Sequence, residues 1–198
     1  MTTQLNPDAA FDCLFIAGRL QVQTGTFTIP ELHLFGYLAC LLWLYRGRAV
    51  ADWGYSFMGT ELGAPFSVDL ELAVTTLLDR GFLIRTLDGV CTSELAEPSV
   101  AEMGSLSLNK DRVECLDSSC ASTAALSSGM VGCALAQEPD LRRAQATPMS
   151  RLLLEDAARS QLFLQFDALR NGLRSGDDLR TPAVVWLTAL YRSSVSAV

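Results

Sequence analysis

A fourteen-residue stretch, Leu32–Tyr45, constrains the fold of this chain more than any other segment. Its sequence, LHLFGYLACLLWLY, has apolar residues at twelve of the fourteen positions. At about 100° per residue these side chains cover every face of a helix, so the rest of the chain must surround it. Thr28, Pro30 and Glu31 precede it with the spacing of a capping box and a proline in the first turn. We therefore predict a central buried helix.

The composition is that of an ordered protein with room for a real core. The chain has 198 residues, of which 49% are hydrophobic and 19% are charged, as in globular rather than disordered proteins. This length suffices for one large domain or two small ones. The net charge of −7 opposes non-specific attraction to nucleic acid or anionic lipid, and only a local basic patch would overcome it.

The N-terminus and the cysteines indicate a cytoplasmic protein. No basic segment followed by an apolar run opens the chain, so no secretory signal is expected. The central stretch is shorter than the roughly twenty apolar residues that a membrane span needs. The six cysteines lack any C-x-x-C pair and indicate reduced, mostly buried thiols. They are Cys13, Cys40, Cys91, Cys115, Cys120 and Cys133.

Apolar spacing predicts a first helix over residues 7–22. Five of its positions share one face: Phe11, Leu14, Phe15, Gly18 and Val22. Residues 49–58 alternate aromatic with small side chains, a pattern typical of a short strand or an extended packed segment. The aromatic residues are Trp53, Tyr55 and Phe57. Residues 59–67 are expected to form one short helical turn, then a tight connection that ends in a cap at Ser67.

The clearest amphipathic helix is predicted over residues 67–80, capped by its first residue. Its apolar positions follow the i, i+3, i+4, i+7, i+8 spacing: Leu70, Ala73, Val74, Leu77 and Leu78. Gly81 follows the last turn, where a left-handed residue is favoured. A β-hairpin is then predicted over residues 82–92, with its turn at Asp88-Gly89.

Helix, extended piece, short helix, turn, amphipathic helix and hairpin follow one another over about residues 28–95. This order resembles a winged helix-turn-helix domain. Residues 61–85 (ELGAPFSVDLELAVTTLLDRGFLIR) are similar to the helix-turn-helix and wing of bacterial regulators. The resemblance implies a mainly α fold with a small β-hairpin, followed by a helical C-terminal region. Winged helices bind DNA or serve as protein-docking modules.

The chain divides into a winged-helix domain (1–96), a connecting segment rich in small residues (97–147) and C-terminal helices (148–198). In the connecting segment a helix is expected over residues 121–136, whereas 97–107 and 137–147 fit either helix or a mobile linker. In the last part, Pro148 or Ser150 can start a short helix through residues 152–158. A further apolar stripe can extend that helix: Leu162, Phe166, Leu169 and Leu173. A second stripe predicts a final helix: Val184, Leu187, Tyr191 and Val195.

No catalytic, cofactor-binding or metal-binding site is expected. The chain lacks H-E-x-x-H, G-x-S-x-G, the Walker pattern, G-x-G-x-x-G and Cys/His metal spacing. Its single histidine, His33, lies near the start of the buried helix, where a hydrogen-bonded core residue is more common than a base. A pocket that holds His33 beside a carboxylate would instead favour an enzyme with a novel site.

The helix over residues 67–80 lacks the side chains with which a helix-turn-helix reads bases. The residues opposite its buried stripe are Val68, Leu72, Thr75, Thr76 and Asp79, flanked by Asp69 and Glu71. None is Arg, Lys, Asn or Gln. Arg80 and Arg85 are the local cations, with Arg46 and Arg48 nearby, against roughly six or more phosphate contacts in typical DNA readers. Sequence-specific DNA binding is therefore disfavoured.

A protein partner fits this face better. Val68 and Leu72 lie one turn apart opposite the core stripe and form an apolar ridge. We predict a partner-binding site from this ridge and its polar neighbours: Val68, Leu72, Thr75, Asp79 and Arg85. The alternative is that residues 96–198 of the same chain cover the ridge.

The size, the winged-helix front half and the helical tail resemble the small middle components of bacterial three-component operons that act in defence against phage and plasmids. In those systems such a subunit joins an SMC-like ABC ATPase to an effector. The resemblance rests on the segment PELHLFGYLACLLWLY and on residues 61–85. It implies a non-catalytic bridging subunit that docks a larger protein. The alternative is a cytosolic winged-helix transcription regulator whose helical C-terminal half dimerises or senses a ligand. An electropositive surface assembled from distant arginines would distinguish it: Arg142, Arg143, Arg151 and Arg159.

Overall fold

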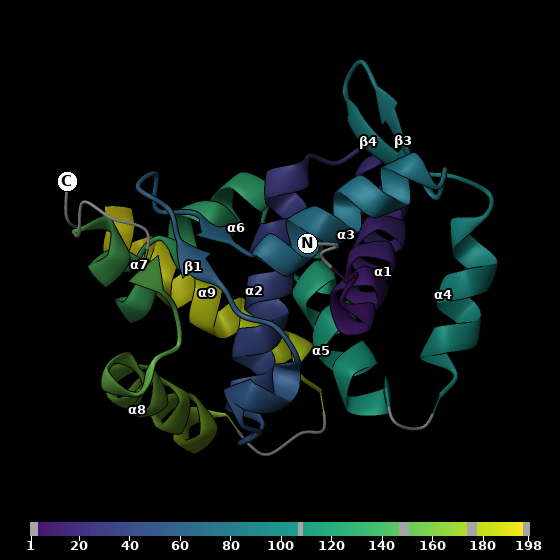
Figure 1. Ribbon diagram of the computed structural model, residues 1–198. Helices are drawn as coiled ribbons and strands as arrows, with labels where there is room; N and C mark the ends of the chain where they lie inside the picture. The colour runs from purple at the N-terminus through teal and green to yellow at the C-terminus, as the bar shows by residue number, and fades with distance from the viewer. Residues whose placement is uncertain (1–3, 107–108, 147–150, 174–177, 196–198) are drawn as a thin grey trace.

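The computed structural model describes residues 4–106, 109–146, 151–173 and 178–195. Over these ranges the protein is mainly α-helical with short antiparallel strands, as predicted (Figure 1). Its α-helices are α1 (Pro7–Thr24), α2 (Ile29–Tyr45), α3 (Val68–Asp79), α4 (Ala96–Gly104), α5 (Lys110–Ala121), α6 (Ser128–Leu135), α7 (Pro139–Gln145), α8 (Asp156–Gly172) and α9 (Arg180–Val195). The remaining elements are the 3-10 helices η1 (Val50–Trp53) and η3 (Ser122–Ala124) and the strands β1 (Met58–Gly59), β2 (Pro65–Phe66), β3 (Leu83–Thr86), β4 (Gly89–Thr92) and β5 (Arg151–Leu152).

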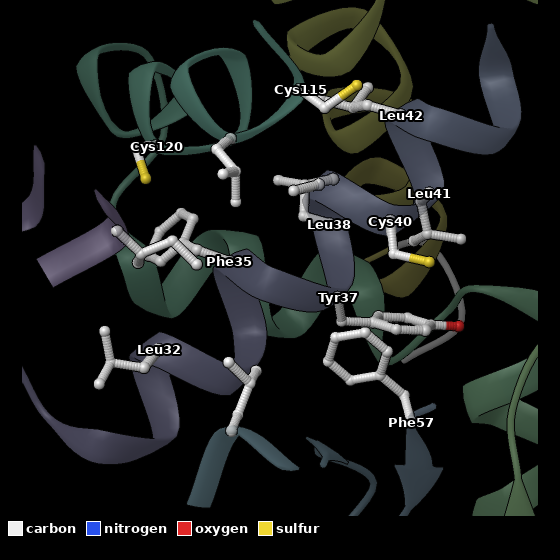
Figure 2. Close-up of a cluster of buried hydrophobic side chains, with 14 of the residues drawn as sticks. Leu32, Phe35, Tyr37, Leu38, Cys40, Leu41, Leu42, Phe57, Cys115 and Cys120 are labelled. Carbon is white, nitrogen blue, oxygen red and sulfur yellow. The ribbon is translucent and has the colours of Figure 1, made fainter. Parts of the chain in front are cut away.

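Helix α2 is the buried centre of the molecule, as its sequence predicts. The Glu31 carboxylate accepts a hydrogen bond from the Thr28 backbone N–H at 2.7 Å, which completes the predicted capping box. Helices α1, α3 and α5 pack around α2 (Figure 1). Figure 2 shows side chains of α2 pointing in several directions, with Cys115 of α5 on one side and Phe57 on the other. Among the described residues, no helix is both long and apolar enough to span a membrane.

Helix α1 confirms most of its predicted apolar face. Asn6 caps the helix, and Phe11, Leu14 and Phe15 are buried. Val22 is 86% exposed, so its predicted place in the buried stripe is wrong. Val22 instead lines a groove between α1 and α4.

The aromatic residues that follow α2 are buried, as their alternation predicts. Trp53, Tyr55 and Phe57 all belong to the hydrophobic core. Trp53 packs edge-on against Trp43 of α2 at a ring-centroid distance of 5.7 Å. The backbone is extended only in part, because η1 takes up Trp53 and the three residues before it.

The short helical turn expected at the start of residues 59–67 is wrong. A hairpin joins β1 to β2 there, closed by hydrogen bonds between Thr60 and Ala64. Strand β1 also pairs with β5, which lies far away in the sequence. The helix expected over residues 152–158 is wrong at its start for the same reason, since Leu152 belongs to β5, while Pro148 and Ser150 lie outside the described residues. Local apolar spacing carries no signal for such long-range pairing.

Helix α3 confirms its prediction closely. Ser67 caps the helix by accepting a hydrogen bond from the Leu70 N–H. The predicted stripe is buried except for Leu78, which is partly buried. Gly81 follows with a φ of +76°, the left-handed conformation expected after a last turn.

The hairpin formed by β3 and β4 is also confirmed, but its turn lies one residue earlier than predicted. The turn residues are Leu87 and Asp88, because Thr86 pairs with Gly89. Gly89 has a φ of +146°, and a Cβ there would lie 2.5 Å from the carbonyl oxygen of Phe27. The close approach arises because Phe27 and β4 exchange two backbone hydrogen bonds. The segment between α1 and α2 is therefore tied to the hairpin.

The described part of residues 97–147 is helical rather than a linker. Helices α4 and α7 occupy most of the two stretches for which helix and linker were both predicted, while Ser107 and Thr147 lie outside the described residues. The helix expected over residues 121–136 is divided between η3 and α6, which Ser127 caps. Buried residues of α5, α6 and α7 belong to the same core as those of α1–α3. The predicted boundaries therefore do not separate independent cores.

The apolar stripes of the C-terminal helices α8 and α9 are confirmed in part. Leu162, Phe166 and Leu187 are buried, whereas the other stripe positions except Val195 are partly buried: Leu169, Leu173, Val184 and Tyr191. Val195 is 61% exposed, so its predicted burial is wrong. Helix α9 packs on α6 and α5.

Most of the cysteine thiols are buried, as predicted. The buried ones are Cys13, Cys40, Cys115 and Cys120, and all six cysteines are free. Burial raises the pKa of both Cys115 and Cys120 to about 12. Thiolate chemistry is therefore disfavoured at these two positions.

Candidate functional site

The predicted docking residues lie on the outer face of α3 and on the first strand of the hairpin. Val68 is 58% exposed, and Thr75, Asp79 and Arg85 are exposed as well, whereas Leu72 is partly buried. Helix α3 packs its other face on α1, α2 and β3. The predicted ridge is therefore exposed to solvent at Val68, whereas the chain itself covers part of Leu72.

The hydroxyl groups on this face are already engaged within α3. Thr75 Oγ1 donates a hydrogen bond to the carbonyl of Glu71 at 3.0 Å, and Thr76 Oγ1 donates to the carbonyl of Leu72 at 2.8 Å. Such bonds to the preceding turn occupy the hydroxyl protons. The face consequently presents apolar and acidic groups rather than donors aimed outward.

His33 lies beneath the start of α3 as a hydrogen-bonded core residue. Its Nδ1 accepts a hydrogen bond from the Ser67 N–H at 3.2 Å, and its Nε2 lies 3.1 Å from Glu71 Oε2. With Nδ1 as acceptor, Nε2 carries the proton of the neutral ring and donates to Glu71. Burial lowers the pKa of His33, and Glu71 opposes that shift. A carboxylate is present beside the histidine, but both ring nitrogens are engaged in joining α2 to α3.

The cations at the end of α2 are paired within the chain. Arg46 and Arg48 both bond to Asp111 of α5, Arg46 at 3.4 Å. This pairing joins the end of α2 to α5 and takes both arginines out of the predicted basic surroundings of α3. Arg80 and Arg85 remain exposed close to α3.

A buried ion pair joins α1 to α5, and the sequence analysis did not identify it. Arg112 Nε and Nη2 donate to the two carboxylate oxygens of Asp12 at 2.6 and 2.7 Å. Tyr55 Oη donates to the same carboxylate at 2.6 Å, and the Arg112 guanidinium lies 4.1 Å from the ring centroid of Trp53. Burial raises the pKa of Asp12, and Arg112 and Tyr55 oppose that rise. A sequence signal for this pair was the acidic residue Asp12 within the apolar part of α1.

The arginines named for the DNA-binding alternative come from three elements: Arg142 and Arg143 of α7, Arg151 of β5 and Arg159 of α8. Acidic groups accompany them. Arg143 and Arg151 lie near Asp140 and lower its pKa against the effect of burial. Arg151 also lies 4.0 Å from Glu155. These arginines therefore do not form a uniformly basic surface.

No metal site is evident in the described ranges, where no group of three or more His, Cys, Asp and Glu side chains is placed to hold an ion. Comparison of the chain with models of protein families, with curated proteins and with solved structures finds no match. The function of the α3 face is therefore inferred from its own residues.

Proposed function

We propose that the protein is a non-catalytic accessory subunit that docks a larger protein partner through the outer face of α3. The observation that carries this proposal is Val68, which is 58% exposed on the side of α3 opposite the buried stripe. Thr75 and Asp79 continue this face along the helix. An apolar side chain beside polar neighbours is typical of a docking surface.

The order of α1, α2, α3 and the hairpin supports a winged-helix interpretation of this region. The short helix that the resemblance placed directly before α3 is absent, because residues 58–66 form the β1–β2 hairpin instead. On this interpretation α2 and α3 are the helix pair, with residues 46–66 inserted between them. The hairpin of β3 and β4 is then the wing (Figure 1).

The charges of this face favour protein over DNA as the partner. Asp79 is exposed on the outer face of α3, with Asp69 partly exposed beside it. DNA docked here would bring its phosphates close to these carboxylates. The face also lacks the side chains that make bidentate contacts with bases.

The partner class that we propose is an SMC-like ABC ATPase within a bacterial defence complex. The support for this class is the resemblance of the chain to the middle components of three-component defence operons. On this proposal the protein bridges the ATPase and an effector and carries no active site of its own.

The substitution Val68→Glu tests the proposal. Val68 is the first residue of α3, where an acidic side chain interacts favourably with the helix dipole, so the fold should persist. We expect the tagged wild-type chain, recovered from its host after nuclease treatment, to retain an ABC ATPase in stoichiometric amount. We expect Val68→Glu to reduce that recovery by roughly tenfold or more.

Leu164→Glu is the matched control, because Leu164 is 70% exposed on α8, away from α3. It should retain the ATPase at the wild-type level. Recovery that Val68→Glu leaves unchanged would contradict the site. Recovery of the chain alone, or recovery that nuclease abolishes, would contradict a stable protein complex.

A further inference from the structure

A second group of buried polar side chains joins α7 to α2. Glu138 is fully buried and caps the first turn of α7. Its Oε2 accepts hydrogen bonds from the Leu141 N–H at 2.9 Å and from Tyr37 Oη at 3.0 Å. In Figure 2 the ring of Tyr37 lies against Phe57, with its hydroxyl directed away from the helix that carries it. One carboxylate thus connects α7 to the central helix.

The other oxygen of this carboxylate has a different environment. In the part of the chain that the structure describes, Glu138 Oε1 is buried without a hydrogen-bond partner. Because both donors reach Oε2, a proton on Oε1 removes the charge and leaves both hydrogen bonds in place. The carboxyl group is therefore arranged to exist in either protonation state.

The segment that leaves β5 is attached to the same region. The Leu154 N–H donates a hydrogen bond to Oδ2 of Asp140, which is also buried. Leu154 has a φ of +63°, a left-handed conformation that is rare for leucine and is stabilised only by its surroundings. The Leu153 N–H donates to the carbonyl of Phe57 at 2.8 Å. Helix α7 and the residues around β5 consequently depend on one buried acidic cluster.

Helix α7 also lies unusually close to β1. A Cβ on Gly59 of β1 would lie 2.4 Å from Cβ of Ala144 on α7, so only glycine fits this contact. Leu141 and Ala144 of α7 are buried there. A small displacement of α7 would therefore open the contact with β1.

We propose that Glu138 is a proton-operated latch on α7. When its carboxyl group is protonated, α7 and β5 remain closed against α2 and β1. When it is ionised, the two elements open locally. The latch consists of Glu138, Tyr37 and the Leu141 amide. Ionisation places a charge in a buried site, and opening relieves that cost because water then solvates the carboxylate.

The pKa of Glu138 supports this assignment. Burial raises it to about 7, although the backbone amides of Leu141 and Asp140 and the hydroxyl of Tyr37 act to lower it. Because this value lies above the ordinary 4.5, the closed form holds more protons than an open form between the two values. Protonation of Glu138 therefore stabilises the closed form fully below about pH 4.5, and this stabilisation is lost as the pH rises through 7.

The other charged groups of the cluster have defined roles. Asp140, from the same helix, acts to raise the pKa of Glu138. Tyr37, from α2, has a pKa that burial raises well above its ordinary value, so it remains a donor throughout this pH range. Arg143 of α7 and Arg151 of β5 lower the pKa of Asp140, whereas Glu155 raises it. These charges act on Asp140, while Glu138 forms its hydrogen bonds with uncharged groups.

Hydrogen exchange of the full chain between pH 5 and pH 8, corrected for intrinsic rates, tests the latch. A rise of the pKa from 4.5 to about 7 corresponds to a change of roughly two orders of magnitude in the opening equilibrium. We expect that increase in the amides of residues 140–146 and 151–154. The amides of α1 should show no corresponding change. Equal protection of α7 at both pH values would overturn the proposal.

Glu138→Gln provides the first variant, because the amide keeps an acceptor for both donors without a charge. Its exchange in α7 should lose the pH dependence. Glu102→Gln, at an exposed carboxylate on α4 outside this cluster, is the matched control and should keep it. Glu138→Gln with the wild-type pH dependence would exclude Glu138 as the titrating group.

Tyr37→Phe provides a second variant that preserves the ring. Because the tyrosine hydroxyl lowers the pKa of Glu138, its removal should move the midpoint of opening to higher pH. An unchanged or lower midpoint would contradict the assigned role of Tyr37. The wild-type chain itself allows a direct test by carbon NMR of labelled glutamate: a Glu138 carboxyl that titrates near 7 supports the latch, and one near 4.5 overturns it.

Discussion

Two buried carboxylates, Asp12 and Glu138, stand in opposite electrostatic environments within one core. Asp12 accepts two hydrogen bonds from Arg112 and one from Tyr55, so a cation and a hydroxyl surround it. Glu138 faces a hydroxyl and backbone amides rather than a cation, and its Oε1 has no hydrogen-bond partner among the described residues. Both side chains are fully buried.

This difference separates a structural carboxylate from a titratable one. Burial alone would lower the pKa of the Arg112 guanidinium, but Asp12 raises it above its ordinary value, so the cation is retained. The pair joins α1 to α5 at any pH near neutrality. Glu138 has no such partner, and its pKa of about 7 makes the attachment of α7 dependent on pH. The effect of burial on a carboxylate therefore depends on whether a cation is buried beside it.

The largest expected effect comes from removing Asp12. Asp12→Ala leaves the Arg112 guanidinium buried beside Trp53 without its counter-ion. We expect a loss of about 3–5 kcal/mol in the free energy of unfolding, since breaking a buried pair leaves an uncompensated charge. Urea denaturation monitored by tryptophan fluorescence measures this loss. A loss below about 1 kcal/mol would mean that water already reaches the pair.

A double substitution distinguishes the lost charge from the lost packing. Asp12→Leu with Arg112→Met removes both charges and keeps apolar volume. Buried ion pairs replaced in this way are often neutral or more stable. We expect the double variant to recover most of the stability that Asp12→Ala loses. A double variant as unstable as Asp12→Ala would show that the charges themselves are needed.

The second largest effect is expected from Glu138→Gln, and only at high pH. The folded-state pKa of Glu138 lies above its ordinary value, so the wild-type protein loses stability as the pH rises from about 4.5 through 7. The amide variant does not lose it. At pH 8 we expect the variant to be more stable by about 2–3 kcal/mol, with little difference near pH 4.5. Urea denaturation at the two pH values measures both. A difference in stability between variant and wild type that is the same at both pH values would contradict the contrast drawn between Glu138 and Asp12.

The smallest effect is expected at an exposed ion pair that serves as reference for both carboxylates. Arg19 and Asp117 lie 2.8 Å apart, and their side chains are 51% and 38% exposed. Like the Asp12–Arg112 pair, this pair joins α1 to α5. Asp117→Ala should cost less than about 1 kcal/mol, because solvent screens the pair. The same denaturation experiment measures this cost. A loss of stability equal to that of Asp12→Ala would show that burial does not explain the difference between the two ion pairs.

The α3 face shows how far angular position alone predicts a surface. Val68 and Leu72 share one face of α3 by helical spacing. Val68 is 58% exposed, whereas Leu72 is partly buried. Helical spacing states which direction a side chain takes from its own axis, but not which neighbouring elements reach it. The apolar positions Val22 and Val195 show the same limit, because both are exposed although each shares a helix face with buried residues.

The sequence by itself determined the central helix α2, the amphipathic helix α3 and the hairpin after it. Each of these depends on residues close together in the chain: an apolar surface on all sides, a helical stripe with its cap, and β-prone residues around a short turn. The physical cause is local. Apolar surface must be removed from water whatever covers it, and caps satisfy the backbone groups of their own helix.

Only the tertiary structure decided which polar groups meet inside the core. Asp12 and Arg112 are 100 residues apart in the sequence, and Tyr37 and Glu138 are 101 apart. The pairing of β1 with β5 is equally distant from any local pattern. Hydrogen bonds and ion pairs are directional and short, so their partners are selected by the final packing of the helices and not by the spacing of residues along the chain.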